Sequence, residues 1–113
     1  MRFKNKYRAT RVGNFASKLE KAVYDILKAQ EVAGEISCLQ CQGEVRLTDA
    51  NILYKPDFVF FKNKAAHYAE AKGFKTAVWA IKKRLWEHYG PGPLDIYEGN
   101  WRYPVLKETV IPK

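Results

Sequence analysis

The sequence lacks a long hydrophobic run of the kind that crosses a membrane, which takes about 18 or more apolar residues. Its first residues, Met1–Lys4, also lack the apolar core of a signal peptide. These two absences predict a protein that works in a cytoplasm and has no membrane partner.

Cysteine and histidine are scarce, with two residues of each. Cys38 and Cys41 cannot build a disulfide scaffold, and reduced thiols are expected. Their C-x-x-C spacing is half of a zinc site or a redox pair, but no second C-x-x-C exists and His67 and His88 lie far from zinc-finger spacing. We therefore predict two buried or partly buried small side chains rather than a metal or redox site.

Acidic residues are outnumbered, with 12 Asp plus Glu against 20 Lys plus Arg and a formal net charge of +8. Such a balance in a short chain favours a polyanionic partner, and nucleic acid before a membrane surface. Residues 1–14 contain no acid and are interpreted as a basic arm that binds nucleic acid; the alternative is a solvated terminus with no partner. The cations of this arm are Arg2, Lys4, Lys6, Arg8 and Arg11.

The pattern of apolar residues predicts one α/β domain over residues 15–98 with a mixed central sheet flanked by helices. Helical spacing runs from Ser17 until Gly34 ends it, and a second helix starts at a Thr76 cap and ends at residues 90–93. Strands are expected over 44–47, from 52 onwards, over 65–72 and over 94–97, followed by an extended tail over 99–113. The predicted core stripe of the second helix comprises Val78, Ile81, Leu85 and Tyr89.

Two acids and a lysine stand in otherwise apolar strands. If Asn63 and Lys64 form a two-residue hairpin turn, Asp57 lies opposite Glu70, with Cβ atoms roughly 5 Å apart on the same face. Lys72, two residues beyond Glu70, shares that face.

Two carboxylates this close repel each other, and a divalent cation would offset that repulsion. Oxygen ligands suit Mg²⁺ or Mn²⁺, and Lys72 would then orient an attacking water or offset charge on the phosphorus. This constellation describes hydrolysis of a phosphodiester. The alternative is an ordinary solvated pair at a sheet edge, with Pro56–Asp57 merely starting a strand.

Glu20 has two possible roles. Ser17 and Glu20 fit a capping box, in which the glutamate closes back on the start of the helix. Glu20 also lies at the flank of the apolar stripe and could point toward the sheet, where it would add a carboxylate ligand. The residues alone leave these two roles open.

The second helix also carries cations and aromatic rings on one flank. Lysines there would neutralise phosphates and a tryptophan would stack on a base; the alternative is a fringe of lysines lying over core tryptophans. The candidate nucleic-acid-binding residues of this flank are Lys75, Trp79, Lys82 and Lys83, next to Trp86.

With Glu20 on a helix, Pro56–Asp57 on a strand and Glu70-Ala71-Lys72 on the next strand, the chain resembles the PD-(D/E)XK nuclease superfamily. Residues 11–20 and 54–58 look like the matching stretches of small phage junction-resolving endonucleases. Residues 70–76 and 82–86 are similar to small phage and prophage proteins of the same superfamily. The resemblance covers residues 11–96.

This resemblance implies a restriction-endonuclease-like αβββαβ core. It implies metal binding by Asp57, Glu70 and the Ala71 carbonyl, a catalytic Lys72, and Glu20 as part of the site, as a catalytic residue and metal ligand. The expected activity is that of a Mg²⁺- or Mn²⁺-dependent endodeoxyribonuclease, phage- or prophage-encoded and acting in a bacterial cytoplasm. Branched DNA such as a four-way (Holliday) junction is the expected substrate, which implies a homodimer. The alternatives are a DNA-binding phage accessory protein without catalysis and a nuclease that cuts linear duplex.

Overall fold

The structure is a computed structural model that describes residues 15–73 and 75–113. The cations of the predicted basic arm, residues 1–14, therefore lie outside the described part. Within it, neither helix has the length and apolar character needed to span a bilayer. The elements in chain order are α1 (Lys18–Val32), β1 (Ser37–Cys41), β2 (Val45–Arg46), β3 (Leu53–Tyr54), β4 (Phe58–Lys62), β5 (Ala65–Ala71), α2 (Ala77–Tyr89), β6 (Leu94–Glu98) and β7 (Val105–Val110).

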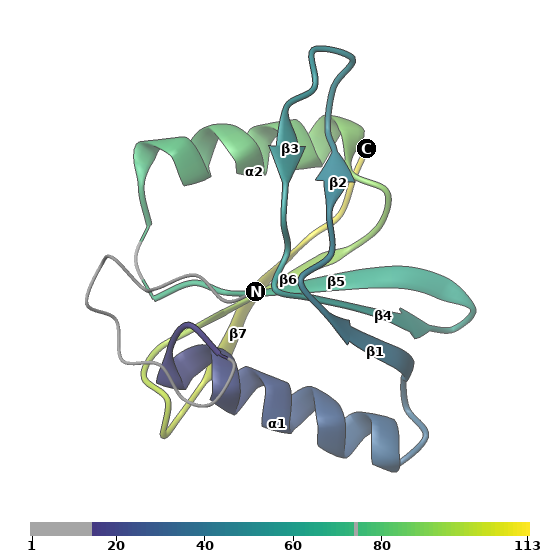
Figure 1. The fold of residues 1–113 in the computed structure, drawn as a ribbon, viewed down its shortest axis with the longest axis vertical. Helices are drawn as coiled ribbons and strands as arrows, with labels where there is room; N and C mark the ends of the chain where they lie inside the picture. The colour runs from purple at the N-terminus through teal and green to yellow at the C-terminus, as the bar shows by residue number, and fades with distance from the viewer. Residues whose placement is uncertain (1–14, 74) are drawn as a thin grey trace, which may run out of the picture.

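The predicted α/β class with a mixed sheet between helices is confirmed. Five strands form one sheet in the order β1-β4-β5-β6-β7, in which β5 and β6 are parallel and the other pairs antiparallel. Helix α1 covers one face of this sheet and α2 the other (Figure 1).

The hairpin of β4 and β5 has the register expected from the sequence. Phe58 pairs with Ala69 and Lys62 with Ala65, and both residues of the turn, Asn63 and Lys64, have positive φ angles. Such angles are typical of the tight turns that join antiparallel strands. This register places residue 57 opposite residue 70, one step beyond the pair of Phe58 and Ala69.

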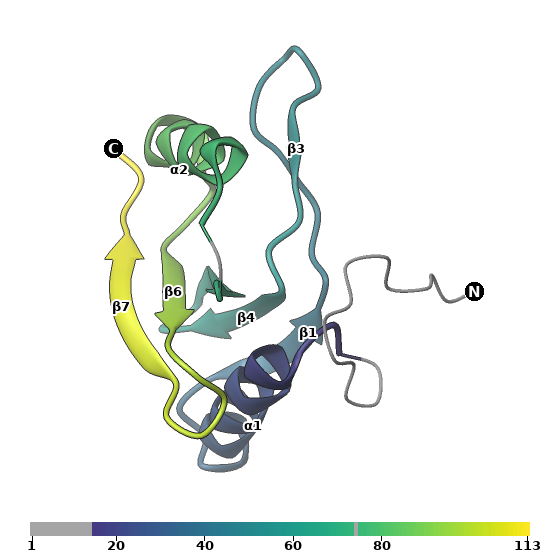
Figure 2. The ribbon, with the colours of Figure 1, turned by 90° about the vertical axis from the view of Figure 1, so that its left-hand side faces the viewer.

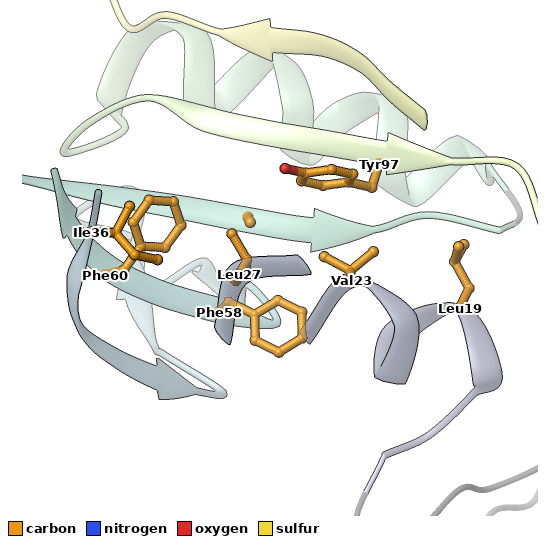
Figure 3. Packing of buried hydrophobic residues seen from close by; sticks show 8 residues of the cluster. Leu19, Val23, Leu27, Ile36, Phe58, Phe60 and Tyr97 are labelled. Carbon is orange, nitrogen blue, oxygen red and sulfur yellow. The ribbon is translucent and has the colours of Figure 1, made fainter. Parts of the chain in front are cut away.

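Two hydrophobic clusters hold the layers together, one on each face of the sheet. Between α1 and the sheet, Val23 and Leu27 pack against Phe58, Phe60 and Tyr97 (Figure 3). Between α2 and the sheet, the cluster comprises Leu47, Tyr54, Tyr68, Trp79, Trp86, Leu94, Ile96 and Val110. Because Ala69 belongs to the first cluster and Tyr68 to the second, the odd-numbered residues of β5 face α1 and the even-numbered ones face α2.

The first strand of the sheet is not the one predicted. Residues 44–47 and 52–54 form the short ribbon of β2 and β3, separate from the main sheet, and this ribbon stands beside α2 (Figure 1). The edge strand β1 takes the predicted place instead, pairing with β4. Its residues are mostly exposed and show no apolar alternation, so the sequence pattern carried no strand signal there.

The predicted extended tail is wrong over residues 105–110. These residues form β7, which pairs with β6 along its length. Only Val110 of this strand is buried, so its place depends on main-chain hydrogen bonds to β6 more than on an apolar face.

The predicted core stripe of α2 is wrong for Val78, Ile81 and Tyr89, whereas Leu85 is partly buried against the cluster under the helix. Val78 and Ile81 are 61% and 60% exposed, whereas Trp79 and Trp86 are buried. One helix can turn only one stripe toward the sheet, and two indole rings bury more apolar surface than valine and isoleucine do. The helix is therefore oriented by its tryptophans.

Candidate functional site

The ladder between β4 and β5 ends in two hydrogen bonds that involve side chains. The amide of Asp57 donates to Glu70 Oε1 at 3.1 Å, and the amide of Ala71 donates to Asp57 Oδ2 at 2.9 Å. Each acid therefore accepts from the main chain on or beside the opposite strand. This exchange fixes both carboxylates at the end of the hairpin farthest from its turn, on the face that α2 covers.

Lys72 is held over the same site from two sides. Its Nζ lies 3.1 Å from Glu70 Oε2 and 4.5 Å from the centroid of the Trp79 ring. The Lys72 amide donates to the Tyr97 carbonyl at 2.8 Å, which continues the pairing with β6 beyond Ala71. An ammonium between a carboxylate and an indole face has little freedom, so the structure presents Lys72 in a defined position.

The site concentrates negative charge where water is scarce. Burial raises the pKa of Asp57, and the neighbouring charges of Glu70 and Glu20 raise it further, against the Ala71 amide and Lys72. Burial likewise raises the pKa of Glu70, which is 6% exposed, against Lys72, Tyr54 and the Asp57 amide. Burial and mutual repulsion thus make the ionised forms of these carboxylates less favourable, and one lysine offsets only part of this free-energy cost.

Glu20 reaches the site from the other face of the sheet. It is buried in the first turn of α1, and its charge raises the pKa of Asp57. This turn lies at the C-terminal end of β5, since a Cβ added to Gly73 would lie 3.9 Å from Leu19. Ser17 Oγ accepts from the Glu20 amide at 3.1 Å, so the helix cap and the proximity to Asp57 coexist.

A pocket of ≈ 490 Å³ opens beside Glu70 and Lys72, between β3, the end of β5 and the start of α2. Lys55 and Lys82 also line it, so its walls carry three lysines and one acid. The sequence argument missed Lys55, although it directly precedes Pro56–Asp57. Neither Asp57 nor Glu20 lines the pocket itself; Asp57 lies behind Glu70.

Tyr54 is a second residue that sequence reasoning missed. Its hydroxyl is buried and has no partner with hydrogen-bond geometry in the described structure, yet it lies close enough to Glu70 for that carboxylate to help raise its pKa above the ordinary value, after burial. The Tyr54 ring packs against Trp79 and Trp86. This contact links the base of the pocket to the core under α2.

The donor set suits a hard divalent cation bound by few protein ligands. In residues 15–73 and 75–113, no group of three or more His, Cys, Asp or Glu side chains is arranged to hold a metal ion. Asp57 and Glu70 nevertheless offer two adjacent carboxylates, and burial raises the pKa of each, with the charges of Glu70 and Glu20 raising that of Asp57 further. Mg²⁺ typically binds proteins through one or two carboxylates and completes its shell with waters and phosphate oxygens. The Ala71 peptide lies beside them, because its amide donates a hydrogen bond to Asp57 Oδ2.

The lysines predicted on α2 have protein partners. Lys75 pairs with Glu98 and Lys83 with Glu108, while Lys82 donates to the Leu53 carbonyl at the pocket. The prediction that Trp79 stacks on a base is wrong, because its ring is buried against Tyr54 and Lys72. The alternative of lysines fringing core tryptophans describes this flank.

The two cysteines differ from expectation in their exposure. Cys38 and Cys41 are free and exposed on β1 rather than buried. Although Cys41 is exposed as a residue, neighbouring atoms partly shield its thiol from water, and this shielding and the charges of Glu20 and Asp57 raise its pKa. The thiol is therefore protonated at neutral pH and is a poor nucleophile.

Comparison with known proteins identifies a family without an assigned activity. A family model described as a protein of unknown function, DUF1064, matches residues 4–109. The chain belongs to this family, because the match spans nearly its whole length. A search of curated proteins finds no match.

Proposed function

We propose that this member of the DUF1064 family is a divalent-metal-dependent endodeoxyribonuclease. One observation carries the proposal: Asp57 and Glu70 meet at a strand end with Lys72 3.1 Å from Glu70, beside an open pocket. Mg²⁺ or Mn²⁺ held by Asp57 and Glu70, with Glu20 nearby, would supply the Lewis acid for phosphodiester hydrolysis.

The residues of the chain have separate tasks in this proposal. Lys55 and Lys82 on the pocket wall attract the phosphate backbone, and the net charge of +8 draws DNA to the protein. Lys72 offsets charge on the phosphate undergoing attack, because its position is fixed by Glu70 and Trp79. Glu70 orients Lys72, and the Ala71 amide orients Asp57.

The finer parts of the proposal come from the resemblance to the PD-(D/E)XK superfamily. They are a branched substrate such as a four-way junction, a homodimer that cuts it symmetrically, and a phage- or prophage-encoded protein in a bacterial cytoplasm. The basic residues 1–14 would add backbone contacts.

The test is cleavage of four DNA forms, namely a four-way junction, a linear duplex, a flap and a single strand, with Mg²⁺ or Mn²⁺. We expect metal-dependent cuts in at least one form, abolished by Asp57→Asn and by Lys72→Met. Lys62→Met is the matched control, since Lys62 lies at the other end of the β4–β5 hairpin. DNA binding without cleavage of any form would favour the rival, a DNA-binding accessory protein.

A further inference from the structure

A second hollow lies between the first half of α1 and the loop that joins β6 to β7. It measures ≈ 710 Å³, and Trp101, Arg102 and Tyr103 of the loop face Lys18 and Lys21 of the helix across it. Figure 2 shows the loop crossing beside α1. We call this hollow the loop groove.

The loop groove lies at the same end of the sheet as the carboxylates. Strands β5 and β6 are parallel, so the end of β6, where the loop begins, neighbours the end of β5, where Glu70 and Lys72 stand. On the helix side, Lys18 and Lys21 flank Glu20 in the sequence, and the charge of Glu20 raises the pKa of Asp57. The groove therefore lies at the same end of the sheet as the candidate active site, on the α1 side, whereas Glu70 and Lys72 line the pocket on the α2 side.

The groove combines exposed aromatic rings with positive charge. Trp101 is 44% and Tyr103 74% exposed, while Lys18 Nζ and the Arg102 guanidinium lie 5.4 and 5.0 Å from the centroid of the Trp101 ring. The groove's acid, Asp25, is already paired with Lys21. Lys18 and Arg102 therefore remain as an uncompensated positive pair.

The loop is held in shape before any ligand arrives. Asn100 Oδ1 accepts from the amides of Arg102 and Tyr103 at 2.8 and 3.1 Å. Gly99 has a φ of +98°, and a Cβ there would lie 3.0 Å from the Tyr103 carbonyl oxygen. The aromatic platform thus needs little ordering on binding.

We propose that the loop groove binds an unpaired stretch of DNA, with one base stacked on Trp101, another on Tyr103, and its phosphates near Lys18 and Arg102. Aromatic rings next to cations suit single strands, because bases in a duplex are stacked on each other and hide their faces. An exposed cation–π contact is weaker than base stacking, so an incoming base displaces a cation from the ring toward the phosphate. The proposal rests on the proposed function for its choice of DNA, and it assigns the nuclease a substrate with a single-stranded arm.

The test measures binding in EDTA, so that cleavage plays no part. Two fluorescent probes are used, a thymine oligonucleotide of about 12 nucleotides, within the usual site sizes for single-strand binding, and a blunt duplex of the same length. We expect Trp101→Ala and Tyr103→Ala each to weaken single-strand binding about tenfold, the loss of one stacked base, and to leave duplex binding within about twofold. Tyr89→Ala, at an exposed tyrosine of α2 on the opposite face of the sheet from α1, is the matched control and leaves both unchanged.

Tryptophan emission gives a second reading. Trp79 and Trp86 are buried and Trp101 is exposed, so the single strand is expected to quench the emission of the unmodified protein and not that of Trp101→Ala. Equal losses for both probes, or no loss and no quenching, would overturn the proposal. If single-strand binding depends on Trp101 and Tyr103 but the protein cuts no DNA, the proposed nuclease activity is refuted and the binding site is not. If the protein cuts DNA and neither substitution changes binding or cleavage, the proposed binding site is refuted and the nuclease activity is not.

Discussion

The substitution Asp57→Asn distinguishes the effect of the buried charges on folding stability from their role in binding a metal ion. Asparagine keeps the shape of the side chain and an oxygen that can accept from the Ala71 amide, and it removes one negative charge beside Glu70. We expect this variant to be more stable than the unmodified protein at neutral pH without divalent metal, because the repulsion between the two acids is gone.

The magnitude follows from Coulomb's law. Two charges about 5 Å apart at an effective dielectric constant of about 20 repel by about 3 kcal/mol. Lys72 already offsets part of this, so we expect a gain of about 1–2 kcal/mol and a rise in Tm of roughly 4–10 °C for a chain of this size.

The pH dependence has a definite sign. Burial raises the pKa of Asp57 and of Glu70 in the folded protein, and the charges of Glu70 and Glu20 raise that of Asp57 further. The folded state therefore holds these protons to higher pH than the unfolded state does. The penalty is absent below the ordinary carboxyl pKa of about 4, grows as the pH rises from there to the raised values, and stays constant above them. The advantage of Asp57→Asn is therefore small at acidic pH and largest at neutral pH.

Addition of Mg²⁺ should cancel most of the stability advantage of Asp57→Asn. A site with a Kd of about 1 mM gains about 1.4 kcal/mol at about 10 mM Mg²⁺, and the gain should be present in the unmodified protein and absent in Asp57→Asn. Thermal melts at several pH values, with and without Mg²⁺, measure both effects, and Asp49→Asn, an exposed aspartate in the β2–β3 turn, is the control. A neutral or destabilising Asp57→Asn, or equal stabilisation of all three proteins by Mg²⁺, would refute the charge-crowding argument.

Two further predictions concern α1 and α2. Ser17→Ala removes the side-chain cap of α1 and is expected to cost about 1 kcal/mol in chemical unfolding. Glu20→Gln keeps the cap, relieves Asp57 of a negative charge and should raise stability at neutral pH; a loss of stability with Glu20→Gln would contradict the repulsion between Glu20 and Asp57. Trp86→Ala is expected to lower the free energy of unfolding by about 3–5 kcal/mol because Trp86 is fully buried. Ile81→Ser, on the exposed side of α2, should change it by no more than about 0.5 kcal/mol. Similar losses for both variants would contradict the orientation of the helix.

The sequence by itself determined the features that depend on neighbours along the chain. The cap at Thr76, whose hydroxyl accepts from the Trp79 amide, and the end of α1 near Gly34 follow from local hydrogen bonding. The β4–β5 register follows from a two-residue turn and the period of two in a strand, so the meeting of residues 57 and 70 was predictable.

Tertiary structure decided which surfaces meet. The polar edge strand β1 forms because β4, which comes after two intervening strands, supplies its hydrogen-bond partners. Strand β7 pairs with the preceding strand β6 although only Val110 among its side chains is buried, so the apolar pattern does not record this pairing. The face of α2 was decided by competition between two apolar stripes for one sheet, which the larger Trp79 and Trp86 won. The approach of Glu20 to Asp57 and the loop groove depend on how α1 docks across the end of the sheet, because long-range packing sets distances that spacing along the chain leaves open.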